Sequence, residues 1–175
     1  MPEPPDHKDR FCVLAAALGH DLGHGAFSHL FEHIVHEILS TSTKRWSHEA
    51  MSVAMLDRAL QEVPRAGTVG ELADADLRFI HECILGKDLH VMPEKFCTNS
   101  ATNSVTYSAT SSAKCKNVAE CREARRGRGP AKEYLYDIVS NIHSGLDVDK
   151  IDYLMRDSHV LGDAHALKVL SILSV

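Results

Sequence analysis

The ten residues HDLGHGAFSH combine three histidines and an aspartate in a spacing that could bind a metal ion. His20 and Asp21 are adjacent at the end of an apolar stretch, and His24 and His29 follow across two glycines. Imidazole nitrogen with carboxylate oxygen is a ligand set that suits Fe, Mn or Mg better than a sulfur-loving metal. A lone His-Asp pair is usually a polar helix end, but four such groups around two glycines favour a metal site.

A second group of charged residues, LDVDKIDYLMRD, lies at residues 146–157. On a helix, Asp149, Lys150, Tyr153 and Asp157 would lie close to a single face. A carboxylate there could complete the metal site, while the lysine and the tyrosine reach toward a substrate on the same side. Taken alone, such a segment is more typical of a solvated, salt-bridged helix surface.

Helices must position these residues, because no segment alternates apolar and polar residues with a period of two. Residues 11–20 are apolar on all sides, which predicts a fully buried helix that carries His20 and Asp21 near its end. Further helices are predicted to begin at Ser28, Ser47 and Asp74, near Glu133, and over about 148–157. Their inward-facing residues are predicted to include Leu30, Phe31, Ile34, Val35, Ile38, Leu39, Met51, Met55, Ala59, Leu60, Leu77, Ile80 and Ile84. The sequence therefore predicts an all-α fold.

The composition favours one intracellular domain, in the nucleus, the cytoplasm or both. The chain has 175 residues, of which 44% are hydrophobic, and a net charge of −5. No apolar run is long enough to span a membrane, and the N-terminus does not have the order of a signal peptide. The five cysteines lack the paired spacing of a zinc ribbon, which favours free thiols.

The segment at about 88–130 has a different composition from the rest. Residues 98–113 are almost entirely Ser, Thr, Asn and Ala, and such a sequence cannot bury enough apolar surface to order itself. A basic stretch follows from Lys114 to Lys132. We predict a long disordered insertion here. The basic stretch could contact nucleic acid, but such tracts are more often solvated tails, which is the prediction that we adopt.

Three motifs together resemble a known family. HDLGHGAFSH (20–29), WSHE (46–49) and LYDIVSN with GLDVDKIDYLMRD (135–157) are similar to motifs of the HD-domain dNTP triphosphohydrolases. The resemblance is strongest to the animal-type enzyme that joins a sterile-alpha-motif domain to an HD domain, and it covers most of residues 11–165 outside the insertion. It implies an all-α HD-domain helical bundle, with an N-terminal tail at 1–10 and a partial HD domain at 11–175.

The resemblance also implies a role for each residue of the motifs. The metal ligands would be His20, Asp21 and Asp149, the catalytic residues His24, His29 and His48, and the substrate-binding residues Lys150, Tyr153 and Asp157. The cofactor would be a divalent ion (Fe, Mn, Mg or Zn), with His29 as the general acid. The implied reaction converts a dNTP, such as dGTP, to a deoxynucleoside and inorganic triphosphate. The full-length family also implies a homo-oligomer.

The chain departs from the family pattern at a few places. Ala26 replaces a proline and Ile151 replaces an aromatic residue. The family's first metal-ligand histidine lies well upstream of the HD pair, and His7, in a proline-rich stretch, is not its replacement. We therefore expect a fragment. The alternatives are another HD-type nucleotide phosphohydrolase or phosphodiesterase, or an inactive HD fragment that only binds nucleotide or a partner. The spacing in HEAMS does not match the HExxH of a zinc protease.

Overall fold

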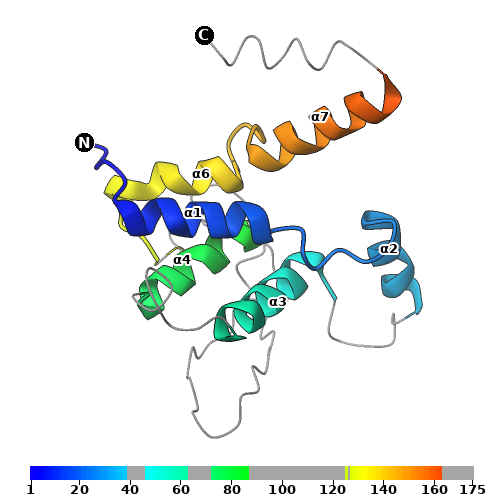
Figure 1. Ribbon diagram of the computed structural model, residues 1–175, viewed down its shortest axis with the longest axis horizontal. Coiled ribbons are helices and arrows are strands. Elements are labelled where there is room, and N and C mark those ends of the chain that lie inside the picture. The colour runs from blue at the N-terminus through cyan, green and yellow to red at the C-terminus, as the bar shows by residue number, and fades with distance from the viewer. Residues whose placement is uncertain (39–45, 63–71, 87–124, 126, 163–175) are drawn as a thin grey trace, which may run out of the picture.

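The computed structural model describes residues 1–38, 46–62, 72–86, 125 and 127–162, and this part of the chain contains helices but no strand (Figure 1). In chain order the elements are α1 His7–Gly19, α2 His29–Ile38, α3 His48–Glu62, α4 Asp74–Leu85, the 3-10 helix η3 Pro130–Leu135, α6 Tyr136–Val139 and α7 Val148–Leu161. The prediction of an all-α fold is confirmed. Most of the predicted low-complexity insertion, and Leu39, lie outside the described residues. Among the described helices, none has the length and apolar character needed to cross a membrane.

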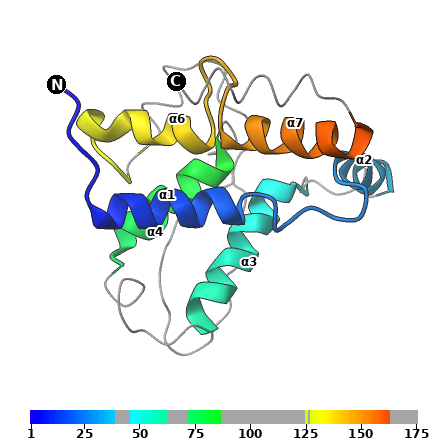
Figure 2. The same cartoon turned by 45° about the horizontal axis from the view of Figure 1, so that its top comes forward.

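One hydrophobic core lies between α1, α3, α4 and α6. Figure 2 shows α1 running between α6 on one side and α4 and α3 on the other. The buried core residues are Cys12, Ala16, Val53, Leu56, Phe79, Ile80, Cys83, Ile84, Leu85, Leu135, Tyr136 and Val139. The rings of Phe79 and Tyr136 meet edge to face with centroids 4.8 Å apart, a favourable arrangement for an aromatic pair. Helix α7 continues beyond α6, and α2 stands to one side of the core (Figure 1).

Helix α4 is the most buried element and matches its prediction well. It begins at Asp74, and Ile80 and Ile84 are buried as predicted. Leu77 is only partly buried. The helix ends at Gly86, whose φ of 54° lies in the left-handed region that glycine adopts without strain.

Helix α1 begins earlier than the sequence indicated and is less buried. Asp6 caps it, because Asp6 and Asp9 each accept a hydrogen bond from the other's backbone N–H. The helix therefore starts at His7, inside the segment predicted to be a tail. The prediction of burial on all sides is wrong, since Leu14 and Leu18 are 61% and 82% exposed.

The inward faces predicted for two other helices are wrong, which in α2 applies to Leu30, Phe31, Ile34, Val35 and Ile38. Helix α2 is amphipathic, but none of its residues is buried. In α3 the prediction that Met51, Met55 and Ala59 face inward is wrong, because all three are exposed. The buried residues of α3 are Ser52, Val53, Leu56 and Asp57. Ser52 and Asp57 can be buried because both are hydrogen-bonded inside the fold.

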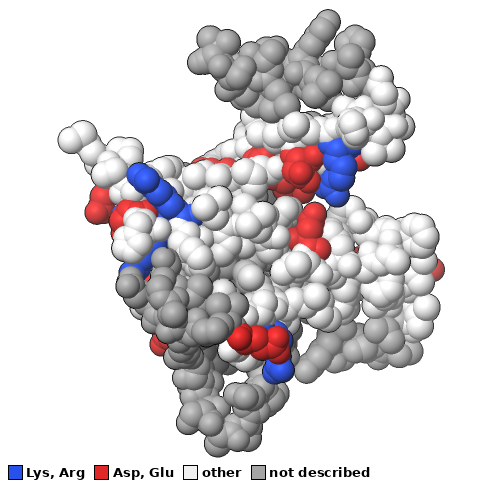
Figure 3. Space-filling view, viewed as in Figure 1, with Lys and Arg blue, Asp and Glu red and all other residues white. Residues whose placement is uncertain are grey.

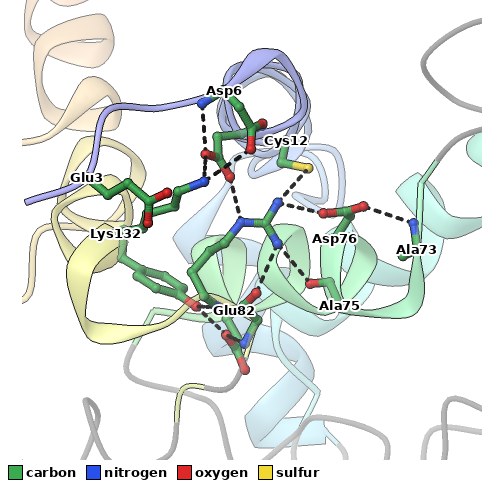
Figure 4. A network of polar contacts seen from close by, with 12 residues as sticks. Glu3, Asp6, Cys12, Ala73, Ala75, Asp76, Glu82 and Lys132 are labelled. Carbon is green, nitrogen blue, oxygen red and sulfur yellow. Dashed lines mark hydrogen bonds and ion pairs between the residues drawn. The ribbon is translucent and has the colours of Figure 1, made fainter.

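A partly buried arginine, Arg128, joins three parts of the chain within the polar network drawn around Asp76 and Lys132 in Figure 4. The Nε of Arg128 donates to Asp9 Oδ1 on α1, and its Nη2 donates to Asp76 Oδ1 on α4, both at 2.6 Å. Lys132 Nζ lies 2.6 Å from the other oxygen of Asp9. The side chains of Asp9 and Asp76 are 1% and 9% exposed, so these are buried ion pairs. The prediction of a solvated basic tail is wrong for Arg128.

The residues before Arg128 are packed as well. Arg125 is 6% exposed, and its guanidinium lies 4.2 Å from the centre of the Tyr136 ring. The N–H of Gly127 and the hydroxyl of Tyr136 both donate to Glu82 Oε2, at 2.9 and 2.6 Å. A β-carbon at Gly127 would lie 2.5 Å from the Cα of Phe79, so glycine is required for this close approach. The end of the predicted insertion is therefore part of the core.

Candidate metal centre

The three predicted metal ligands lie together where α1 meets α7. His20 Nε2 is 3.3 Å from Asp21 Oδ1 and 3.2 Å from Asp149 Oδ1. Asp149 stands in the first turn of α7, whose N-cap Asp147 accepts a hydrogen bond from the backbone N–H of Lys150. One ligand atom from each of these three residues lies within 4.8 Å of the ligand atoms of the other two. On the face drawn in Figure 3, acidic side chains line a hollow below α7.

The hydrogen bond on the other side of the His20 ring prepares Nε2 for a metal. Nδ1 donates to the carbonyl of Ala17 at 2.8 Å, which leaves the lone pair on Nε2 when the ring is neutral. Nε2 is buried without a hydrogen bond and faces two carboxylates. Burial alone would lower the pKa of His20, but the Ala17 carbonyl and the charges of Asp21 and Asp149 together raise it. A divalent cation fits this set of donors, because it would satisfy all three groups at once.

The turn that carries the site is held by a serine that the sequence reasoning missed. Ser52, on α3, donates to the carbonyl of His20 and accepts a hydrogen bond from the N–H of Gly23 at 2.8 Å. A β-carbon at Gly23 would lie 2.2 Å from the carbonyl oxygen of His48, so only glycine allows α3 to approach this closely. Ser52 lies one helical turn after His48, and this i, i+4 spacing could have indicated its direction.

Three histidines form a second cluster beside the predicted metal ligands. The rings of His24 and His48 are stacked with centroids 3.9 Å apart, and His29 meets them edge-on at 5.1 and 5.3 Å. His24 Nε2 lies 3.5 Å from Asp21 Oδ1, so the two clusters share a side chain contact. Burial and the neighbouring His48 lower the pKa of His24, which favours its neutral form. The structure thus brings together all three predicted catalytic histidines.

The backbone just before His29 is strained. Phe27 and Ser28 have φ values of 68° and 51°, in the left-handed region that non-glycine residues seldom occupy. The turn closes with a hydrogen bond from the N–H of Ser28 to the carbonyl of Gly25 at 3.0 Å. This tight turn starts α2 at a point where His29 faces His24. Strained residues of this kind are concentrated at functional sites.

Two glutamates next to His48 were not predicted to be part of the site. The Nδ1–H of His48 donates to Glu32 Oε2 on α2 at 2.7 Å. Glu49 Oε2 lies 3.5 Å from the same nitrogen. Glu32 fixes the tautomer of His48, because an ionised carboxylate can only accept a hydrogen bond. Its position three residues after His29 places it on the same helix face as that histidine.

The three predicted substrate-binding residues lie on α7, the helix that supplies Asp149. Lys150 and Tyr153 are partly buried, and Asp157 is exposed. The spacing of Asp149, Tyr153 and Asp157 is i, i+4 and i+8, which keeps them near one helix face. Their roles in binding remain predictions.

Known proteins resemble this chain over most of its length. It is 38% identical over 161 residues to the deoxynucleoside triphosphate triphosphohydrolase SAMHD1 of Xenopus laevis, and 34% identical over 158 residues to that of Homo sapiens. The SAMHD1 homolog of Dictyostelium discoideum is 32% identical over 150 residues. These alignments cover 90%, 89% and 86% of this chain. The chain is SAMHD1-like.

The resemblance drawn from the three motifs is thereby confirmed. The SAMHD1 proteins are much longer, and the chain spans 22%, 21% and 20% of the length of these three relatives. No family model matches the chain.

Proposed function

We propose that this site hydrolyses deoxynucleoside triphosphates to a deoxynucleoside and inorganic triphosphate, with a divalent metal ion. The observation that carries the proposal is the junction of two clusters at the 20–29 turn. His20, Asp21 and Asp149 offer a ligand set, and His24 and His29 stand directly beside it. The activity for which the SAMHD1 relatives are named supplies the substrate class.

His20, Asp21 and Asp149 would hold the metal ion. When bound, such an ion lowers the pKa of a coordinated water and provides hydroxide near neutral pH. The hydrogen bond to the carbonyl of Ala17 keeps the proton on Nδ1 of His20 and the ring in position. The carboxylates supply the negative charge that a divalent ion requires in a half-buried site.

The three histidines would handle the protons and charge of the phosphate ester. His29 would protonate the departing 5′-oxygen, a general-acid role that typically contributes about 10²–10⁴-fold to a rate. His24, whose pKa is lowered, would stay neutral near pH 7 and donate a hydrogen bond to phosphate. The hydrogen bond from Nδ1–H of His48 to Glu32 would hold this ring against His24 and leave its Nε2 free to accept a proton.

Helix α7 would bind the remainder of the substrate. Lys150 follows the ligand Asp149 directly, and its ammonium would neutralise phosphate oxygens. Tyr153 and Asp157 lie one and two turns further along α7 and would contact the deoxyribose. The aromatic ring would pack on the sugar, and the carboxylate would accept a hydrogen bond from its 3′-hydroxyl.

The proposal is tested by incubating the metal-loaded protein with dGTP and separating the products. We expect deoxyguanosine and intact triphosphate in equal amounts, with loss of turnover in His29→Ala. Release of phosphate or pyrophosphate would instead identify another HD-type nucleotide phosphohydrolase. Binding of dGTP without any product would identify a chain that only binds nucleotide.

A further inference from the structure

A cluster of two carboxylates and one imidazole lies between α2 and α3, next to the three stacked histidines, and includes His48. It consists of Glu32, His48 and Glu49, whose ligand atoms, one from each residue, all lie within 4.8 Å of one another. Their side chains are only 20%, 14% and 24% exposed. We call this set the Glu32–His48–Glu49 cluster.

The cluster has more negative charge than its single proton donor can satisfy. Both carboxylates approach the same atom, His48 Nδ1, with Glu32 Oε2 at 2.7 Å and Glu49 Oε2 at 3.5 Å. The Glu32 oxygen takes the hydrogen bond, and Glu49 Oε2 is buried without one. Within the described part of the chain, neither glutamate pairs with a lysine or arginine. Partly buried carboxylates normally require a counter-charge.

His36 gives its hydrogen bond to the backbone and not to Glu32. Its Nε2 donates to the carbonyl of Trp46 at 2.6 Å and lies 3.9 Å from Glu32 Oε1. The Nε2 atom of His36 is therefore already used in a shorter hydrogen bond to the backbone. The cluster is left with three groups that can accept a cation.

We propose that the Glu32–His48–Glu49 cluster is a second divalent-cation site, separate from His20, Asp21 and Asp149, which takes a transition-metal ion such as Zn²⁺. Imidazole nitrogen and carboxylate oxygen both bind zinc, and three protein ligands leave one coordination position open. The two glutamates neutralise the ion, and the ion satisfies the buried Glu49 oxygen. It replaces the proton on Nδ1 of His48, so the ion and the hydrogen bond to Glu32 exclude each other.

The ion would also attach α2 to the rest of the molecule. None of the residues of α2 is buried, so little packing holds this helix in place. Glu32 comes from α2, whereas His48 and Glu49 are the first two residues of α3. An ion shared by these residues ties the two helices together. If the proposed hydrolysis is correct, the ion also replaces the hydrogen bond that holds His48 to Glu32, and excess Zn²⁺ inhibits.

The test measures binding of Zn²⁺ in an Asp21→Asn background, which disables the other ligand set. We expect Asp21→Asn to retain one Zn²⁺ by calorimetry. Adding Glu49→Gln in that background should lower the affinity for Zn²⁺ by at least about 10-fold, since loss of an outer-shell partner alone costs that much. Glu37→Gln is the matched control, because among the described residues Glu37 on α2 pairs only with exposed His33. It should leave the affinity unchanged.

Amide exchange gives a second readout that is independent of turnover. Zn²⁺ should slow exchange of residues 29–38 in Asp21→Asn but not after Glu49→Gln, with circular dichroism melts confirming that each variant is folded. Equal Zn²⁺ affinity with and without Glu49→Gln would overturn the proposal. So would binding that disappears with His29→Ala yet survives Glu49→Gln, because the ion would then sit among the three histidines. Neither outcome depends on dGTP hydrolysis.

Discussion

His20 Nε2 lies 3.2 Å from Asp149 Oδ1, so the last turn of α1 meets the first turn of α7 through two polar side chains. Helix α1 belongs to the core, whereas α7 has no buried residue. The placement of α7, with Lys150, Tyr153 and Asp157 on it, therefore depends on this contact more than on hydrophobic packing. A metal ion between the two helices would make the contact stronger.

Removing either carboxylate among the predicted metal ligands His20, Asp21 and Asp149 should release the metal. We expect Asp21→Ala and Asp149→Ala to lose the ion that the wild-type protein retains through gel filtration, as measured by elemental analysis. His33→Ala is the control, since His33 is exposed and, in the part of the chain that the structure describes, pairs only with exposed Glu37. Retention of metal by Asp149→Ala would mean that α7 does not contribute a ligand.

A methyl group at Gly23 should disturb the site. Its β-carbon would lie 2.2 Å from the His48 carbonyl oxygen and 2.4 Å from the Ser52 nitrogen, and both are backbone atoms that cannot rotate away. Gly23→Ala should therefore separate the turn from α3 and lower metal affinity by about 10-fold or more. Gly129→Ala is the matched control, because nothing lies within 4 Å of its added carbon. Equal metal affinity in the two variants would contradict the geometry.

Loss of Arg128 should destabilise the fold severely. Arg128→Met keeps an unbranched apolar stem but leaves Asp9 and Asp76 buried without their guanidinium. Breaking a buried pair in this way typically costs about 3–5 kcal/mol in free energy of unfolding, which urea titration measures. Arg156→Met removes an exposed pair with Asp152 and should cost less than about 1 kcal/mol.

The same region should make stability sensitive to acid. The hydrogen bond from the backbone of Asp9, with help from Lys132, lowers the pKa of Asp6 from 3.8 to about 2. The pKa of Asp9 is lowered too, since burial, which raises it, is outweighed by Lys132, the Asp6 backbone and Arg128. A carboxyl with a lower pKa in the folded state adds stability above its unfolded pKa. That contribution to stability is lost as the pH falls through the pKa that the carboxyl has in the folded state.

Asp6→Asn separates this titration from helix capping, because asparagine caps a helix about as well as aspartate. Between pH 3.8 and about 2, the free energy of unfolding should fall less steeply in Asp6→Asn than in the wild-type protein. Urea titrations at several pH values measure both slopes. Parallel curves for the two proteins would show that Asp6 does not contribute to acid sensitivity.

The motif spacing predicted which side chains lie together, because residues on one short turn can hardly be far apart. A stretch of only ten residues contains His20, Asp21, His24 and His29. The pairing of this turn with Asp149 came from the resemblance to known enzymes, since the sequence has no local signal for a contact between α1 and α7. Glu32 and Ser52 were missed because their roles depend on how α2 and α3 approach the turn.

Hydrophobic periodicity was less reliable for the buried faces. In α3 it selected Met51 and Met55, but the core accepts Ser52 and Asp57, which are hydrogen-bonded to Gly23 and His81. A hydrophobicity pattern cannot identify a polar residue that is satisfied only after folding. The basic tract illustrates the same limit, because the burial of Arg128 depends on carboxylates from two distant helices.

The segment between Gly86 and Arg125 leaves from the end of α4 and returns to it, since Gly127 packs against the backbone of Phe79. Both ends are thus anchored on one helix, whatever lies between them. The entropy of closing a loop rises only with the logarithm of its length, and each doubling costs about 0.6 kcal/mol. Insertions and deletions in this segment should therefore be tolerated, and it is a natural place to graft a tag or a foreign domain without disturbing the metal centre.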